Sequence, residues 1–109
     1  MVLLRRKNRD EGSPAPTAEP VGTPIAEARP RQQVCVVGKV TRMTARPTSG
    51  QPALAVNISD DTGTVTAVWT GRREIGGITL GRRVAITGVP VVHGERLEFT
   101  NPGYTLLSR

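Results

Sequence analysis

The sequence is poor in the residues that build metal centres and disulfide frameworks. Its 109 residues include one cysteine, Cys35, and one histidine, His93. A structural zinc site usually takes four cysteine or histidine ligands, so these two residues cannot assemble one. A single cysteine also excludes an internal disulfide framework and fits a reducing compartment, from which we expect a cytoplasmic location. We expect no metal and no cofactor.

Aromatic residues and long apolar runs are also scarce. The chain has one Trp, one Tyr and one Phe, and no apolar stretch approaches the roughly 20 residues that cross a bilayer. At the N-terminus, apolar residues 1–4 precede a basic cluster at 5–9, whereas a secretory signal has its charges first and a longer apolar segment after them. We therefore expect neither a secretory signal nor a membrane partner. The sequence also holds no phosphate-binding loop and no nucleophile motif, from which we predict no enzymatic activity.

Positive charge is in excess, and most of the excess lies in one part of the chain. Residues 1–31 hold six basic and four acidic residues, a net of +2, whereas residues 32–109 hold nine basic and five acidic residues, a net of +4. Clustered cations gain affinity for a polyanion by releasing its condensed counterions. The charge therefore favours a polyanionic partner, although a mildly basic domain is also common in proteins without one.

Proline divides the chain into two parts. Five prolines interrupt residues 5–31, which show no apolar periodicity and cannot bury enough surface to offset the entropy of ordering. We predict a disordered, Pro-rich basic tail over residues 1–31 and one folded domain over residues 32–109. The basic cluster at 5–9 either adds attraction to phosphates or is a solvated terminus without a role.

A β-hairpin is the clearest local prediction. Apolar residues alternate with small or polar ones over 54–59 and again over 64–69. A period of two on both sides of a short glycine-containing loop is typical of a hairpin. We expect Gly63 to take a positive φ, and Asp60 or Asp61 to bond the backbone and close the loop. The two adjacent carboxylates are therefore interpreted as turn residues rather than as a catalytic pair.

The rest of the folded part predicts three more strands, which gives an all-β domain of five. Gly38, in the middle of a long strand, typically marks a bulge or a bend. Gly76 and Gly77 disfavour a long helix between the third and fourth strands. The remaining elements are a first strand over 34–46, a short helical turn or irregular crossover over 71–81, a fourth strand over 82–92, a fifth over 96–100, and a segment over 104–107 that packs over a barrel end.

Several stretches of this pattern carry a resemblance to a known family. They are Val36-Val-Gly-Lys-Val40, Leu54-Ala-Val-Asn-Ile-Ser-Asp-Asp-Thr-Gly63, Val65-Thr-Ala-Val-Trp69, Gly81-Arg-Arg-Val-Ala-Ile-Thr-Gly88 and Leu97-Glu-Phe-Thr-Asn-Pro-Gly-Tyr104. On these residues the chain resembles the tRNA-anticodon-binding-like group of the oligonucleotide/oligosaccharide-binding (OB) fold, including the wedge domain of the RecG-type branched-DNA helicase. The resemblance covers residues 33–107 and implies a five-stranded Greek-key OB-fold barrel.

The resemblance implies a nucleic-acid-binding groove across the second and third strands, flanked by the loops that join strands one to two and four to five. Arginine suits such a groove because its planar fork grips phosphate and its face stacks on bases. The paired arginines after the third strand can also be solvated strand ends. The candidate binding residues are Lys39, Arg42, Arg46, Asn57, Thr66, Val68, Trp69, Arg72, Arg73, His93 and Arg96.

Aromatic stacking platforms are what this groove lacks. Single-strand binders usually stack bases on aromatic side chains, at about 1–3 kcal/mol per base. Trp69 shares the apolar side of its strand, so we expect it in the core unless a bulge near Gly71 rotates it outward. Phe99 alternates with Leu97 and is expected in the core, whereas Tyr104 is open between packing and stacking. We predict weak, salt-sensitive and sequence-tolerant binding that rests on arginine and backbone contacts.

Three functions are compatible with these residues. The first is non-enzymatic binding of single-stranded DNA or RNA, or of a strand junction, in an accessory role in nucleic-acid metabolism, with a protein of that metabolism as a further partner. The second is an OB-fold protein–protein interaction module without nucleic-acid binding. The third is a barrel that oligomerises through exposed edges of strand one or four. Net charge and arginine placement favour the first function, and the scarcity of groove aromatics favours the second.

Overall fold

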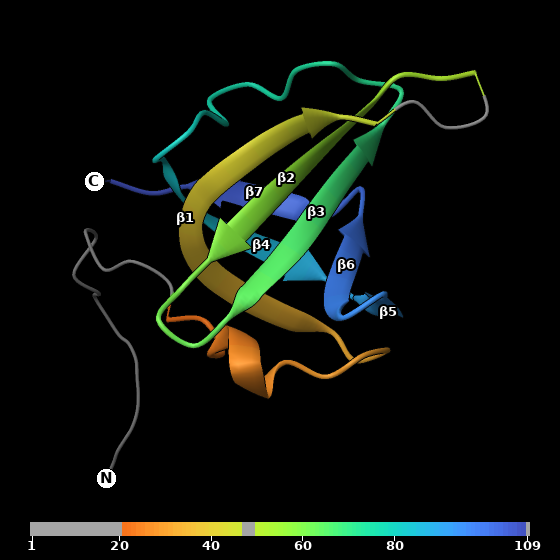
Figure 1. Ribbon diagram of the computed structural model, residues 1–109. Helices are drawn as coiled ribbons and strands as arrows, with labels where there is room; N and C mark the ends of the chain where they lie inside the picture. The colour runs from red at the N-terminus through yellow and green to blue at the C-terminus, as the bar shows by residue number, and fades with distance from the viewer. Residues whose placement is uncertain (1–20, 47–49, 109) are drawn as a thin grey trace, which may run out of the picture.

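The computed structural model describes residues 21–46 and 50–108 as one all-β sheet with a single turn of 3-10 helix (Figure 1). Within these residues the strand order is β5-β6-β3-β2-β1-β4-β7, and neighbouring strands are antiparallel except for the parallel pair β3 and β6. None of the described helices is long or apolar enough to span a membrane. The elements are η1 (Ile25–Glu27), β1 (Val34–Ala45), β2 (Ala53–Ser59), β3 (Thr64–Thr70), β4 (Arg83–Gly88), β5 (Val91–His93), β6 (Arg96–Thr100) and β7 (Gly103–Leu106).

Alternation along the strands places one face of the sheet in the core, as the sequence predicted. The hairpin is confirmed, and the apolar side chains on its inner face are buried together in the core. Burial of these side chains is the main favourable term in folding, since each removes apolar surface from water. The core cluster includes Val36, Val40, Leu54, Val56, Ile58, Val65, Ala67, Trp69, Val84, Ile86 and Phe99.

Strand β1 serves both halves of the sheet because it bends. Its first half pairs with β4 and its second half with β2, and a β-bulge interrupts the register between Val40 and Arg42. Gly38, where a bulge or bend was predicted, lies two residues before this bulge. A Cβ atom at Gly38 would lie 2.6 Å from the carbonyl oxygen of Ser59, closer than real Cβ contacts come. Glycine at this position therefore lets β1 pass close to the end of β2.

Asp60 closes the hairpin loop, which confirms one of the two alternatives from the sequence. Its Oδ1 accepts hydrogen bonds from the backbone N–H groups of Thr62 and Gly63 and from the Thr62 hydroxyl. The expectation for Gly63 was wrong, because its φ is not positive. A Cβ there would lie 3.1 Å from Cγ2 of Ile25, so the glycine leaves room for that side chain.

The same loop holds η1 against the sheet. Asp60 Oδ2 accepts a hydrogen bond from the Ile25 N–H at 2.9 Å, and the Thr62 hydroxyl accepts one from the Ala26 N–H at 3.0 Å. Partial burial alone would raise the pKa of Asp60. The hydrogen bonds from the Thr62 hydroxyl and from the N–H groups of Ile25, Thr62 and Gly63 outweigh it and lower that pKa below its ordinary value.

The folded part of the chain begins earlier than the sequence predicted. A disordered tail was expected up to residue 31, but Ile25 is only 6% exposed and belongs to the core cluster. The Thr23 N–H also bonds to the Cys35 carbonyl, and the Arg31 N–H to that of Pro90. Residues 1–20 of the predicted tail lie outside the described residues. The prediction failed for residues 22–31 because their partners lie far along the chain and leave no local periodicity.

The predicted fourth strand is two strands, and the predicted closing segment is a strand as well. Pro90, which has no N–H to donate, separates β4 from β5 within residues 82–92. Residues 103–106 form β7, which pairs with β4 instead of packing over a barrel end. The described part therefore has seven strands instead of five, and its hydrogen bonding ends at β5 and β7 without closing a barrel. β4 and β5 lie far apart in the strand order, yet a link of only two residues connects them along the chain.

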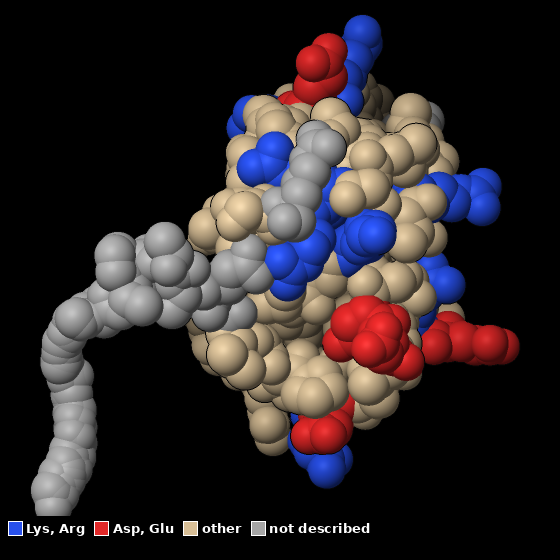
Figure 2. All heavy atoms as spheres, turned by 90° about the vertical axis from the view of Figure 1, so that its left-hand side faces the viewer, with Lys and Arg blue, Asp and Glu red and all other residues tan. Residues whose placement is uncertain are grey.

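The segment between β3 and β4 is irregular, as predicted. It covers residues 71–82 and buries Ile75 and Ile78 against the core. Strands β1 and β4 are interior in the strand order, although β1 pairs with β4 along its first half and with β2 along its second half. Lys and Arg side chains gather in the middle of the face on the side where β1 bends, with Asp and Glu side chains below them (Figure 2).

Candidate nucleic-acid interface

The outer face of β2 and β3 forms a floor of small side chains. Register pairs Ala55 with Val68 and Asn57 with Thr66, so each pair lies side by side on this face. Ala53, Ala55 and Val68 form an apolar cluster that is separate from the main core. A floor without bulky groups allows an extended ligand to approach the strands closely.

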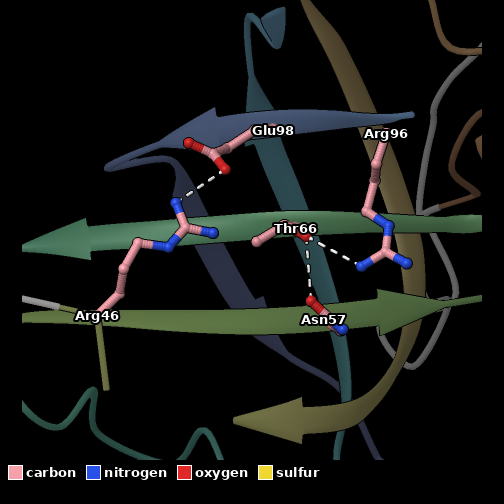
Figure 3. A network of polar contacts seen from close by, with 5 residues as sticks. All are labelled: Arg46, Asn57, Thr66, Arg96 and Glu98. Carbon is pink, nitrogen blue, oxygen red and sulfur yellow. Dashed lines mark hydrogen bonds and ion pairs between the residues drawn. The ribbon is translucent and has the colours of Figure 1, made fainter. Parts of the chain in front are cut away.

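A polar network crosses this floor (Figure 3). The Thr66 hydroxyl donates a hydrogen bond to Oδ1 of Asn57 at 3.0 Å and accepts a longer one from Arg96 at 3.5 Å. Thr66 is only 6% exposed, so its hydroxyl needs these partners. Arg96 comes from the start of β6, beside the β5–β6 turn, which is one of the two loops expected to flank the groove.

Arg46 approaches the same floor from the other flanking loop. Its guanidinium donates a hydrogen bond to Oε1 of Glu98 at 3.0 Å, and the two side chains are 36% and 13% exposed. The parallel pairing of β3 with β6 places Glu98 beside Thr66, so the carboxylate lies within the network (Figure 3). Two guanidiniums therefore reach the floor from opposite ends, and a carboxylate partly neutralises one of them.

Two surface hollows adjoin Arg46, one towards each flanking loop. His93 and Arg96 line the first together with Arg46 and Thr66. Arg73 lines the second, beside residues 50–53. Besides these residues, the first hollow is lined by Glu95, Leu97 and Glu98, and the second by Ala45. The structure thus brings together residues that are far apart in the sequence into one surface.

The other basic candidates lie at different distances from this surface. Arg42 is exposed and lies directly opposite Asn57, so it extends the polar row onto β1. Arg72 is exposed in the irregular segment after β3, and no described contact ties it to the floor. Lys39 lies on the other side of the β1 bulge, opposite Arg83 of β4 and outside the groove.

Trp69 and Val68 were proposed as binding residues, and their burial argues against direct contact. Trp69 is 5% exposed and lies in the core, where its Nε1 donates a hydrogen bond to the Pro102 carbonyl at 3.2 Å. The expectation that Trp69 lies in the core is confirmed, and no bulge rotates it outward as the alternative required. Val68 does face the floor but is only 4% exposed.

The other two aromatic residues also lie away from the groove. Phe99 is fully buried, as predicted. Tyr104, on β7, packs edge-on against Trp69 with ring centroids 5.7 Å apart, and its hydroxyl donates to the Gly76 carbonyl. Because β7 lies at the far end of the strand order from β6, the groove floor carries none of the three aromatic rings.

Sequence reasoning missed the acidic residues of the groove. Glu98 lies between Leu97 and Phe99, which were both predicted to point inward, so the same alternation already predicts an outward Glu98. What the sequence does not show is the parallel pairing that sets this carboxylate beside Thr66. In the described ranges, no three His, Cys, Asp or Glu side chains are placed to hold a metal ion.

Comparisons with known proteins agree with this fold. The family model described as OB-fold nucleic acid binding domain matches residues 34–107. The chain therefore belongs to the OB-fold nucleic acid binding domain family. A crystal structure of yeast Stn1 and Ten1 is similar, with a TM-score of 0.55 over 71% of this chain and 43% of that chain. At 15% sequence identity this likeness concerns the fold alone, and the chain spans less than half of that protein's length. No curated protein matches the sequence.

Proposed function

We propose that this protein binds single-stranded nucleic acid, without catalysing a reaction, across the outer face of β2 and β3. One observation carries the proposal: Arg46 and Arg96 reach the Asn57–Thr66 floor from opposite ends of an OB fold. A strand that crosses the floor would meet a guanidinium near each end. Guanidinium groups contact phosphate through two parallel hydrogen bonds, so they suit a backbone-directed mode of binding.

Different side chains on this surface would contact the phosphates and the bases of the strand. Arg42, Arg73 and Arg96 are exposed and are suited to phosphate contacts, which fix the strand but carry no sequence information. The half-buried Asn57 is the polar group suited to base edges, and the buried Thr66 hydroxyl holds its side chain in place. Because no aromatic ring lies on the floor, stacking would fall to guanidinium planes and to the exposed His93. This chemistry supports weak, salt-dependent and sequence-tolerant binding.

The carboxylate of Glu98 would compete with a phosphate for Arg46. A phosphate that binds Arg46 must displace or share a carboxylate that already lies 3.0 Å away. Partly exposed ion pairs are worth at most about 1 kcal/mol, so a phosphate is able to exchange with the carboxylate. The pair keeps the Arg46 side chain over the floor in the free protein.

The wider role proposed here follows from the fold family and the sequence. The resemblance to the wedge domain of RecG-type helicases is the reason for including a junction of single and double strands among the ligands. The proposed domain covers residues 32–109, extended by the segment from residue 22 that packs on it. An accessory role in DNA or RNA metabolism, beside a protein of that metabolism and in the cytoplasm, is consistent with these features.

Fluorescence anisotropy of a labelled oligonucleotide tests the proposal. The wild type should bind a single strand of about 16 nucleotides at low salt, within the range that OB folds occupy. The double variant Arg42→Gln/Arg96→Gln should bind more weakly, and its plot of log affinity against log salt should be shallower by about 1.4, because each lost single-strand phosphate contact removes about 0.7.

The matched control removes the same charge elsewhere. Arg29→Gln/Arg31→Gln changes two exposed arginines that precede β1 and are absent from the groove. This variant should bind like the wild type. Absence of wild-type binding at low salt, or equal losses in both variants, would contradict the proposal.

A second candidate function, a protein–protein interaction module, is favoured by an exposed apolar group at the sheet edge. Val89, Val91 and Val92 are 51%, 47% and 63% exposed, in and beside the edge strand β5. Exposed valines on a short edge strand are typical of surfaces that pair with another chain. If this candidate is right, Val91→Thr/Val92→Thr abolishes partner binding, and the anisotropy experiment shows no oligonucleotide binding.

A further inference from the structure

Two like charges face each other on the sheet outside the groove. Lys39 of β1 and Arg83 of β4 are direct partners in the antiparallel ladder, which places their Cβ atoms about 5 Å apart. Both point outward, because the residues that follow them, Val40 and Val84, are in the core. Like charges in this position repel each other, so the pair is a feature that a bound anion would relieve.

The position of these two cations is partly fixed. The Arg83 guanidinium donates a hydrogen bond to the Ser108 carbonyl at 3.2 Å. Lys39 is exposed, and no described residue forms an ion pair with it. Both line one surface hollow. The hollow is also lined by Val37, Gly38, Thr41, Ser59, Asp60 and Asp61.

The carboxylates at the edge of this hollow form no ion pair with Lys39. Asp60 is already committed to the N–H groups of Ile25, Thr62 and Gly63 and to the Thr62 hydroxyl. Asp61 is exposed and has no side-chain hydrogen bond or ion pair among the described residues. The Lys39 side of the hollow is therefore available to an anion from solution.

The hollow continues the groove along the outer side of β1. Arg42 lies opposite Asn57 at the groove. Lys39 lies opposite Ser59, which is two residues further along β2. At about 3.3 Å per strand residue, Lys39 lies roughly 23 Å from Arg46 along β1. Thr41 lies between them and is bonded to the Asn57 carbonyl at 3.4 Å. A row of basic and hydroxyl side chains thus leads from the groove to the β4 side of the sheet.

We propose that Lys39 and Arg83 form a second phosphate-binding contact, which holds the backbone of the bound strand after it leaves the groove. The inference rests on the proposed function and adds to it the path and the length of the ligand. A short oligonucleotide fills the groove alone, whereas a longer one reaches both contacts. The ligand class is a single strand that is longer than the floor of β2 and β3.

The test compares two lengths of the same mixed-sequence oligonucleotide, about 6 and about 16 nucleotides, by anisotropy at several salt concentrations. Lys39→Gln/Arg83→Gln should bind the short strand like the wild type and the long strand more weakly. Its salt slope for the long strand should fall by about 1.4, and that of Lys39→Gln alone by about 0.7. The single variant changes only an exposed side chain, so it covers the case in which loss of the Arg83–Ser108 bond disturbs the fold. Arg29→Gln/Arg31→Gln is the control.

Two outcomes would overturn the inference. One is an unchanged salt slope for the long strand in both Lys39 variants, and the other is an equal loss of affinity for the short and the long strand. In both cases the Arg42→Gln/Arg96→Gln variant still reports on the groove, so the proposed function is judged separately. If the wild type binds neither length at low salt, the proposed function and this inference both fail.

Discussion

Arg46 and Glu98 lie 52 residues apart in the sequence and form an ion pair of 3.0 Å across the outer face of the sheet. The pair joins the end of β1 to β6 beside Thr66, in the middle of the proposed groove. It restrains a guanidinium that would otherwise move freely, and it also adds a negative charge where a phosphate is expected. These two effects on binding have opposite signs, and they can be separated experimentally.

Glu98→Gln should increase the affinity for single strands. The substitution keeps the size of the side chain, frees Arg46 from a partly exposed ion pair and removes a charge that repels phosphate. The affinity should rise by at most about fivefold at low salt, because a partly exposed ion pair such as Arg46–Glu98 contributes at most about 1 kcal/mol. Anisotropy with the long oligonucleotide measures it. Glu27→Gln, an exposed residue of η1, is the control; a drop in affinity for Glu98→Gln would mean that positioning of Arg46 outweighs repulsion.

Trp69 fluorescence should not respond to the oligonucleotide. The indole lies in the core, is bonded to the Pro102 carbonyl and packs against Tyr104, so no base can stack on it in the folded state. Emission intensity and wavelength should therefore stay constant at saturating oligonucleotide, while anisotropy of the labelled strand rises. Strong quenching on binding would show that Trp69 is a contact residue and that the register of β3 changes in the complex.

Gly38→Ala should destabilise the protein by about 1–3 kcal/mol, the usual cost of overpacking. The added methyl group would lie 2.6 Å from the Ser59 carbonyl oxygen, and a backbone atom cannot move away as a side chain can. Gly103→Ala is the matched control, because its nearest neighbour would be 3.8 Å away. Urea unfolding at neutral pH measures both midpoints. Equal midpoints for the two variants would refute the close approach of β1 to β2.

The Asp60 carboxylate should make stability depend on pH. Its pKa in the folded protein is lowered from the ordinary 3.8, so the ionised group stabilises the fold above about pH 4. That contribution is lost as the pH falls through the folded-state pKa. Asp60→Asn should be less stable than the wild type by about 1 kcal/mol at pH 7, because both carboxylate oxygens accept hydrogen bonds and an amide offers only one acceptor oxygen.

Urea unfolding at pH 7 and at pH 3 checks this prediction. The difference between the wild type and Asp60→Asn should be smaller at pH 3 than at pH 7, because the unfolded chain takes up a proton at Asp60 more readily than the folded one does. Asp61→Asn serves as the control, since Asp61 has no side-chain hydrogen bond in the described part of the chain. A difference that stays constant with pH would mean that the charge of Asp60 does not hold η1.

Local pattern in the sequence predicted the parts of the fold that depend on neighbours in the chain. The period of two in the hairpin gave the buried face of β2 and β3, and the Asp60 turn followed from ordinary turn chemistry. The five-strand count failed because Pro90 breaks one strand and because β7 owes its existence to pairing with β4. The residues of β7 and those around Ile25 show no pattern of their own that predicts a strand or a core position.

The candidate site was predictable to a similar degree. Arg46, Asn57, Thr66 and Arg96 were expected along one groove. They lie on one face of the sheet, Arg46 paired with Glu98 and the other three joined by hydrogen bonds, and their role in binding stays a prediction. Lys39 was assigned to the groove because it is on the outward side of the first strand, but it lies beyond the β1 bulge, between Ser59 of β2 and Arg83 of β4. The bulge depends on how β2 and β4 share β1, which is a property of the assembled sheet.

Backbone amide NMR shifts during titration with a single-stranded oligonucleotide test the central claim most directly. Addition of the strand should move the signals of Asn57, Thr66 and Arg96 and of the residues beside Arg46, and should leave those of Val91 and Val92 in place. Shifts confined to the exposed valines of β5, or no shifts at low salt and saturating oligonucleotide, would contradict binding across β2 and β3.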